Sequence, residues 1–333
     1  MDRRGVNVLV LSDLWQPFPG GAERLMFNIA RDLDRRPEFD VRVLTSYELA
    51  AQMDGPPVEF REVGVFTRRA EGAAVIRDAL TSSTFRPDVV IVHHLFAYEF
   101  DEVLRRSRLP IVQIVLNTRR LAHARLAVYI SDHVRAAVPS LGRRGDMTMI
   151  PPAFDDVVPD VAVDPCHRPY VGFIKPIEHK GVSLVYDIAR HFPGPQRFLI
   201  LRGEWQTLEL IEDLPNVEFM EPVDEISEFY AACRIVLMPS VSEDAGTVAQ
   251  ECALNGIPCI SSNVGGLPQT NAGGIRLTSR DPAEWIRAIL SLGDQPRYDD
   301  VVDRQRAAYD ETRRDDQMDE LADRIARIVA RRR

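Results

Sequence analysis

Apolar residues follow two alternating patterns along this chain. Short runs rich in Val, Ile and Leu predict strands, and stretches with apolar residues three to four positions apart predict helices between them. In the first half, Leu25, Ile29 and Leu33 share one predicted helical face, and the strand runs are 6–11, 41–46, 88–94, 111–117 and 127–131. In the second half, a helix is expected over 182–191, and the strand runs are 169–174, 197–203, 216–220, 234–240 and 258–262. This alternation predicts an α/β fold with parallel sheets covered by helices on both faces.

The pattern is interrupted once, by a segment rich in proline and aspartate at 149–165. We interpret it as an interdomain linker. The simplest organisation is two doubly wound, Rossmann-like domains, 1–155 and 156–305, facing a central cleft, followed by a C-terminal helix over 306–333. Ligands of such folds bind at the carboxyl ends of the strands. The terminal helix is expected to pack back on the N-terminal domain.

Composition narrows the class of protein. The 333 residues are 45% hydrophobic, enough for two cores, and the net charge of -9 disfavours nucleic-acid binding. No run approaches the roughly 18 apolar residues of a transmembrane helix, and the N-terminal apolar run is too short and polar for a signal peptide. The four cysteines show no metal-like spacing. We therefore expect a soluble, cytoplasmic protein without a metal site or disulfides.

The basic residues are unevenly distributed. Lys and Arg together number 41, yet only Lys175 and Lys180 are lysine, and both lie in the segment KPIEHKG. Lysine is a compact point charge suited to phosphate, and arginine is not equivalent to it. The pair is therefore a candidate phosphate site, although chance clustering is the alternative.

The stretch 239–269, PSVSEDAGTVAQECALNGIPCISSNVGGLPQ, has the most informative spacing. A strand ends in a loop with Glu243, and Gly246 and Thr247 then begin a helix that contains Glu251. Free N–H groups at a helix start favour anionic oxygens, and carboxylates accept hydrogen bonds from sugar hydroxyls. This locus could hold phosphate, ribose and hexose together. An ordinary surface loop and helix with scattered acidic residues is the alternative.

The same stretch resembles the signature of the family 4 retaining glycosyltransferases, which have the GT-B fold. The family pattern P-S-x-x-E-x-x-G-x-x-x-x-E, followed by A-x-G-x-P and G-G-x-x-E, is matched at Pro239, Ser240, Glu243, Gly246, Glu251, Gly256, Pro258, Gly265 and Gly266. Two positions depart from it, with Leu254 at the family's alanine and Gln269 at its closing glutamate. The resemblance implies that Glu243 faces the donor sugar, that Glu251 holds the nucleotide ribose, and that Ala245, Gly246 and Thr247 contact the donor.

Other segments resemble the family in the same order along the chain. The lysine segment resembles V-G-R-L-x-x-x-K-G, which implies that Lys175 and Lys180 neutralise the donor diphosphate. The segment 216–240 resembles the family's base-binding loop and following strand, which implies donor contacts at Glu221 and Val223. Gly20 and Gly21 resemble the glycine-rich first loop of the N-terminal domain, whose backbone is expected to lie against the donor.

The acceptor side is less defined. His93 and His94 end a predicted strand, and we assign His94 as a candidate catalytic group near the acceptor, with a purely structural histidine pair as the alternative. Asn117 stands where the family commonly has a histidine. The arginine-rich stretch 119–144 could meet an anionic acceptor or a membrane surface, although a solvated face explains it as well.

Together these features predict a retaining, metal-independent glycosyltransferase without a cofactor. Its donor would be a UDP- or GDP-linked sugar and its acceptor a small molecule or saccharide. Two alternatives remain: a nucleotide-sugar epimerase of the same fold, and a non-catalytic partner that binds nucleotide sugars.

Overall fold

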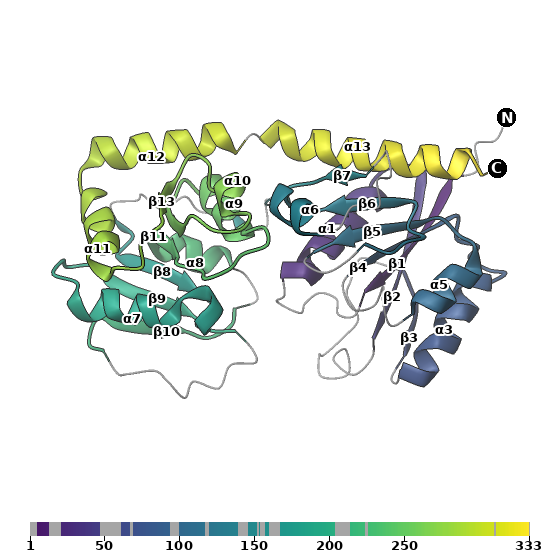
Figure 1. Ribbon diagram of the computed structural model, residues 1–333, viewed down its shortest axis with the longest axis horizontal. Helices are drawn as coiled ribbons and strands as arrows, with labels where there is room; N and C mark the ends of the chain where they lie inside the picture. The colour runs from purple at the N-terminus through teal and green to yellow at the C-terminus, as the bar shows by residue number, and fades with distance from the viewer. Residues whose placement is uncertain are drawn as a thin grey trace. The chain divides into compact units, whose positions relative to one another are not determined.

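The computed structural model describes most of the chain and divides it into two compact units. The described residues are 5–12, 21–46, 61–66, 69–93, 100–116, 120–138, 146–151, 153, 157–159, 167–203, 214–223, 226–309 and 311–332. One unit comprises Met1–Ile150 with Asp315–Arg333, and the other comprises Pro151–Arg314. The boundaries expected from the sequence, after 155 and after 305, lie five and nine residues away from these. Each unit is described here by itself (Figure 1).

The N-terminal domain contains a parallel sheet. Among the described residues the strand order is β3-β2-β1-β4-β5-β6-β7, and every neighbouring pair is parallel. The strands are β1 (Val6–Ser12), β2 (Phe39–Ser46), β3 (Arg61–Phe66), β4 (Val89–His93), β5 (Ile111–Val115), β6 (Leu126–Tyr129) and β7 (Met147–Thr148). The helices of this domain are α1 (Gly21–Asp34), α3 (Arg69–Thr81), α5 (Asp101–Ser107), α6 (Asp132–Ala137) and most of α13 (Glu311–Ala330).

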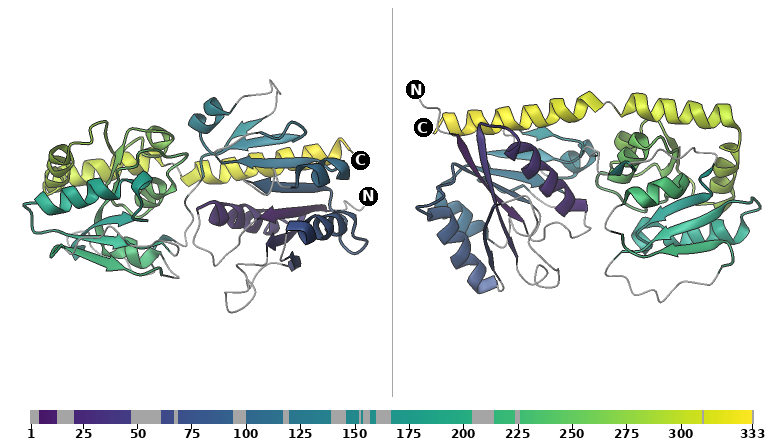
Figure 2. Two further views of the ribbon diagram at one scale, coloured as in Figure 1. Left: turned by 60° about the horizontal axis from the view of Figure 1, so that its bottom comes forward. Right: turned by 180° about the vertical axis from the view of Figure 1, so that it is seen from behind.

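Apolar side chains at alternate strand positions pack against the apolar faces of the helices. Leu9 and Leu11 of β1 share a core cluster with Ile76 of α3 and Leu104 of α5. Helix α1 contacts β1 and β2, and Figure 2 shows it running alongside these strands. The domain is therefore doubly wound, as the alternating pattern predicted.

The C-terminal helix α13 completes the N-terminal domain. Its apolar residues Met318, Leu321, Ile325 and Val329 are buried. Polar contacts hold it to the rest of the domain: Asp319 pairs with Arg36 at 2.6 Å, and Gln317 accepts a hydrogen bond from the backbone N–H of Ile150 at 2.8 Å.

The tail predicted as one helix over 306–333 is divided between two helices among the described residues. Helix α12 (Gln295–Ala308) ends at Tyr309, which has an extended backbone, and α13 begins at Glu311. The Tyr309 side chain is buried, and its hydroxyl donates to the carbonyl of Ala153 at 3.0 Å. Helix α12 therefore ends where Tyr309 is anchored to the segment that follows the first domain.

The C-terminal domain contains a second parallel sheet, with the strand order β10-β9-β8-β11-β12-β13 among the described residues. Its strands are β8 (Tyr170–Ile174), β9 (Arg197–Leu201), β10 (Val217–Met220), β11 (Cys233–Met238), β12 (Cys259–Ser262) and β13 (Ile275–Leu277). Its helices are α7 (Val182–His191), α8 (Ser227–Ala232), α9 (Thr247–Leu254), α10 (Leu267–Thr270), α11 (Pro282–Ser291) and α12, with a 3₁₀ turn η3 (Glu178–Lys180).

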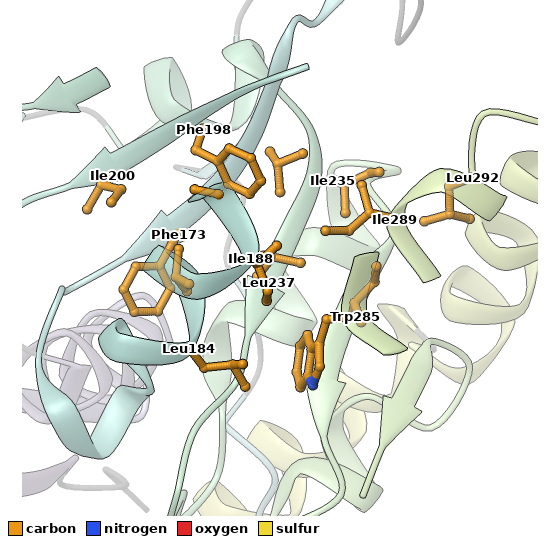
Figure 3. Packing of buried hydrophobic residues seen from close by; sticks show 14 of the residues in the cluster. Phe173, Leu184, Ile188, Phe198, Ile200, Ile235, Leu237, Trp285, Ile289 and Leu292 are labelled. Atoms are coloured by element: carbon orange, nitrogen blue, oxygen red, sulfur yellow. The ribbon is translucent and has the colours of Figure 1, made fainter. Parts of the chain in front are cut away.

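Alternation along β11 divides this core into two layers. Ile235 and Leu237 face a cluster with α7, α11 and α12, in which Trp285 is fully buried (Figure 3). Val236 and Met238 face the opposite cluster with α8 and α9. Because helices cover both faces, the strand is apolar without a break from Ile235 to Met238, and the sequence shows a continuous apolar run there. The two packed layers fix where β8 and β11 end, and the loops beyond those ends carry the candidate site.

Candidate functional site

The strand order of the C-terminal sheet reverses between β8 and β11. The chain proceeds from β8 outward through β9 to β10, then returns to β11 on the other side of β8. The loops that follow these two adjacent parallel strands therefore diverge, and ligands of doubly wound folds bind at such a switch point. The two loops, 175–181 and 239–246, contain five of the residues expected from the sequence to contact the donor: Lys175, Lys180, Glu243, Ala245 and Gly246.

The two loops are held in direct contact. The backbone N–H of Val241 donates to the carbonyl of His179 at 2.8 Å. Gly181 has a φ of +89°, and a Cβ at that position would lie 2.1 Å from the carbonyl oxygen of Pro239. Only glycine allows both this backbone conformation and this approach. The glycine of the KPIEHKG segment therefore brings the lysine loop against the glutamate loop.

Lys180 and Glu243 form an ion pair across these loops. The Lys180 Nζ lies 2.5 Å from the Glu243 Oε2, and their side chains are 26% and 10% exposed. The hydroxyl of Ser240 donates to the same carboxylate oxygen at 3.2 Å. The family resemblance implies that Lys180 meets the diphosphate and Glu243 the sugar, and the structure shows in addition that these two side chains contact each other. A cation and a carboxylate are thus placed side by side, partly open to solvent.

The glutamate loop leads into the N-terminus of α9. Gly246, with a φ of +81°, is the N-cap, and no side chain caps the first turn. The first N–H groups of a helix have no intrahelical partner and carry partial positive charge. Ala245 is buried beside them, whereas Thr247 is half-buried. This end of α9 can therefore accept an anionic oxygen close to Lys180.

Hydrogen bonds from α10 and from the turn before it hold the glutamate loop in place. The N–H of Gly266 donates to the carbonyl of Glu243 at 2.9 Å, and the Thr270 hydroxyl donates to the carbonyl of Ala245 at 2.7 Å. A Cβ on Gly265 would lie 1.8 Å from the Glu243 carbonyl oxygen. The double glycine predicted as part of the motif thus acts by permitting close backbone packing, which fixes the loop.

Glu251 lies further along α9 and is only 6% exposed. The hydroxyl of Tyr230, on α8, donates to its Oε2. Sequence analysis named Glu251 but missed Tyr230, because an aromatic residue in a short amphipathic helix is normally read as core. The only available signal was its phenolic hydroxyl, which needs a partner when buried.

The remaining lysine lies at the end of β8. Lys175 is exposed and has a φ of +64°, which is uncommon for a residue other than glycine. Its backbone N–H donates to the carbonyl of Leu201 at 2.9 Å. Burial lowers the pKa of the nearby His179, and the positive charges of Lys180 and Lys175 lower it further. Both lysines therefore belong to one loop, which carries net positive charge, and both lower the pKa of the histidine in it.

Glu221 and Val223 follow β10, which is separated from β8 by β9. Glu221 is 71% exposed and pairs with Arg202 at 2.6 Å, and Val223 is half-buried. These residues lie at the same carboxyl edge of the sheet as the lysine loop. The described contacts do not bring them to Lys180 or Glu243.

The N-terminal candidates are only partly described. Gly20, His94 and Asn117 lie outside the described residues, and Gly21 is the exposed first residue of α1. His93 is described: it is buried at the end of β4, and its Nε2 lies 2.9 Å from the hydroxyl oxygen of Ser12 at the end of β1. Since the strand order of this sheet reverses between β1 and β4, this pair marks the switch point of the N-terminal domain.

Metal-ligand clusters and membrane-spanning helices are both absent from the described residues. No three His, Cys, Asp or Glu side chains within them are grouped to hold a metal ion. No helix in the same part of the chain has the length and apolarity to cross a membrane.

The part of the chain that carries this site is similar to known glycosyltransferases. Residues 168–295 match the family model described as glycosyl transferases group 1. The chain is 37% identical over 94 residues to a D-inositol 3-phosphate glycosyltransferase of Corynebacterium kroppenstedtii, covering 26% of this chain and 21% of that protein. It is 29% identical over 206 residues to the same enzyme of Rhodococcus erythropolis, covering 55% and 46%. The chain thus spans less than half the length of these relatives.

Solved structures show the same fold over nearly the whole chain. Anabaena Alr3699/HepE in complex with UDP and glucose has a TM-score of 0.75 at 16% identity, covering 96% of this chain and 100% of that one. Sucrose-phosphate synthase from Thermosynechococcus elongatus has a TM-score of 0.71 at 15% identity, covering 95% and 98%. The resemblance to family 4 glycosyltransferases and the GT-B fold expected from it are confirmed.

Proposed function

We propose that this chain is a family 4 glycosyltransferase of the GT-B fold and that it transfers a sugar from a nucleoside-diphosphate sugar to a small-molecule or saccharide acceptor. The observation that carries the proposal is the Lys180–Glu243 pair beside the uncapped N-terminus of α9. A diphosphate needs positive charge and N–H donors, and a hexose needs carboxylate acceptors. The site supplies all three within one pair of loops.

Binding would rearrange this pair. A donor diphosphate entering beside the N-terminus of α9 draws the Lys180 ammonium toward its oxygens, which releases the Glu243 carboxylate to accept hydrogen bonds from the sugar hydroxyls. The Ser240 hydroxyl, already on Glu243 at 3.2 Å, keeps the carboxylate in place during the exchange. Glu251, deeper along α9, accepts from the ribose hydroxyls.

Catalysis would then be electrostatic. Negative charge grows on the leaving diphosphate as the glycosidic bond breaks, and Lys180, Lys175 and the end of α9 stabilise it. In this proposal no metal ion takes part, and the sugar keeps its anomeric configuration. The departing phosphate accepts the proton of the acceptor hydroxyl, with His94 as the candidate group on the acceptor side.

Two findings guide the choice of substrates for the test. Structural neighbours contain UDP and UDP-glucose, and relatives are named for D-inositol 3-phosphate. The test is a thermal-shift panel of UDP, GDP and their sugars, because a ligand that binds the folded state raises its unfolding temperature. Product analysis follows, with the best donor and inositol phosphates, inositol and simple saccharides as acceptors. If none of the nucleotides raises the unfolding temperature, the proposal is contradicted.

The alternatives are distinguished by the products. An epimerase converts the nucleotide sugar without an acceptor, and a non-catalytic partner binds the nucleotide without consuming it. Transfer, or slow hydrolysis to free sugar and nucleoside diphosphate, excludes both.

A further inference from the structure

A buried hydrogen bond connects the two helices that precede and follow β11 in the chain. Tyr230 lies on α8, just before the strand, and Glu251 lies on α9, just after the loop that follows it. The Tyr230 hydroxyl donates to the Glu251 carboxylate, and both side chains are buried, at 0% and 6% exposed. The motif includes the glutamate and does not include the tyrosine.

Tyr230 is held rigidly in the core. Its ring packs edge-on against Phe229, with ring centroids 5.4 Å apart, and it belongs to the cluster between the sheet and α8 and α9. A hydroxyl fixed in this way restricts the rotamer of the glutamate, because a buried carboxylate that turns away loses a charge-assisted hydrogen bond.

We propose that Tyr230 is a positioning residue that orients the Glu251 carboxylate for the ribose hydroxyls and so sets the preference of the site for ribonucleotides over deoxyribonucleotides. This inference rests on the proposed function, in which Glu251 binds ribose. The carboxylate has two oxygens, and the tyrosine occupies Oε2. Because the tyrosine already orients the carboxylate, less free energy is spent on ordering it when ribose binds, and binding is tighter.

The experiment measures dissociation constants by calorimetry for UDP, 2′-deoxy-UDP and 3′-deoxy-UDP, with the GDP series in parallel. The proteins are wild type, Tyr230→Phe, Glu251→Ala and the double variant. Tyr298→Phe is the matched control: Tyr298 is equally buried in the same domain, and its hydroxyl donates at 3.1 Å to the backbone carbonyl of Arg234. It therefore reports the cost of removing a buried tyrosine hydroxyl away from the site.

We expect Tyr230→Phe to weaken ribonucleotide binding by about three- to tenfold. It should leave the affinity for the deoxy analogue that lacks the contacted hydroxyl unchanged. The preference for ribose then falls, while Tyr298→Phe keeps it. In the Glu251→Ala background, Tyr230→Phe should have no further effect on that preference, because the two residues act as one unit.

Three results separate failure of this inference from failure of the proposed function. If Tyr230→Phe keeps the wild-type ratio of affinities, or weakens the binding of all the nucleotides equally, the positioning role is wrong and the donor site stands. If the Tyr230 and Glu251 effects on the ratio add, the tyrosine acts by another route. If the wild-type protein binds none of the nucleotides, the proposed function itself fails.

Discussion

The Lys180–Glu243 pair gives the sharpest test of the site in the unliganded protein. We expect Lys180→Met and Glu243→Gln to be strongly non-additive in their effects on the free energy of unfolding. Each single variant removes one charge and leaves the other without its main partner in a partly buried position. The double variant removes both charges together, so it should cost less than the sum of the single variants.

The magnitude follows from the geometry. Two unit charges 2.5 Å apart attract by about 7 kcal/mol at an effective dielectric constant of about 20, but desolvation of both groups offsets most of this. Fully exposed pairs are worth about 0.2–1 kcal/mol, and breaking a buried pair costs about 3–5 kcal/mol. With side chains 26% and 10% exposed, this pair lies between these cases. We expect a coupling free energy of about 1–2 kcal/mol.

The assay is urea unfolding followed by tryptophan fluorescence. Trp285 is fully buried in the core of the C-terminal domain, which contains the ion pair. It becomes the sole fluorescent tryptophan once the other two, Trp15 and Trp205, are replaced by phenylalanine. Both of these lie outside the described residues. A matched control is the Arg190–Asp187 pair on α7, which has an N–O distance of 2.7 Å but side chains 38% and 48% exposed. Its coupling should stay below about 0.5 kcal/mol.

The result that refutes the reasoning is additivity. If the effects of Lys180→Met and Glu243→Gln add within about 0.5 kcal/mol, the two charges do not interact in solution. The proposed exchange, in which Lys180 leaves Glu243 for the donor diphosphate, is then wrong. A coupling as large in the control pair would show that the cycle measures helix stability rather than the site.

Four further predictions concern the same loops. Glu251→Ala should weaken binding of the nucleotide that the panel identifies by about 1.5–3 kcal/mol in calorimetry, since a charged acceptor of ribose hydroxyls is lost; unchanged affinity rules out the ribose assignment. Lys180→Ala should lower kcat more than it raises KM, because the charge it meets grows in the transition state, and steady-state kinetics with an unaltered kcat would remove it from catalysis. A chelator should leave transfer activity unchanged, and loss of activity that Mg²⁺ or Mn²⁺ restores would overturn the metal-free mechanism. The His179 pKa is lowered in the folded protein by burial and by Lys180 and Lys175; its contribution to stability is therefore full above the ordinary histidine pKa and is lost as the pH falls through that value toward the folded pKa. The urea midpoint should fall over this range, and His179→Gln should reduce that fall.

The sequence determined the architecture because each element carries its own local signal. Runs such as Ile235–Met238 are apolar at every position, and a strand with helices on both faces buries them all. The spacing of Leu25, Ile29 and Leu33 likewise fixed which face of α1 is buried. The break between α12 and α13 had no such signal, because Tyr309 ends the helix through a contact with Ala153, 156 residues away in the chain.

The motif residues of the donor site could be identified from the sequence because their spacing follows from a strand, a loop and a helix start that are contiguous in the chain. Gly246, Glu243 and Glu251 all lie within that single stretch. Lys180 could be named for the same reason, from its own loop. What the residues do to one another could not be read, since the loops after β8 and β11 are more than sixty residues apart in the chain and meet only because the two strands are neighbours.

Tertiary structure alone decided the partners. The lysine assigned to phosphate is already paired with the glutamate assigned to sugar, and the glutamate assigned to ribose is held by Tyr230. Hydrogen bonds and ion pairs depend on distances of a few ångströms between side chains, and no pattern of residue types along a chain specifies such distances between segments that are remote in sequence. The sequence thus determined which chemical groups the site contains, and packing of β8 against β11 decided which of them meet.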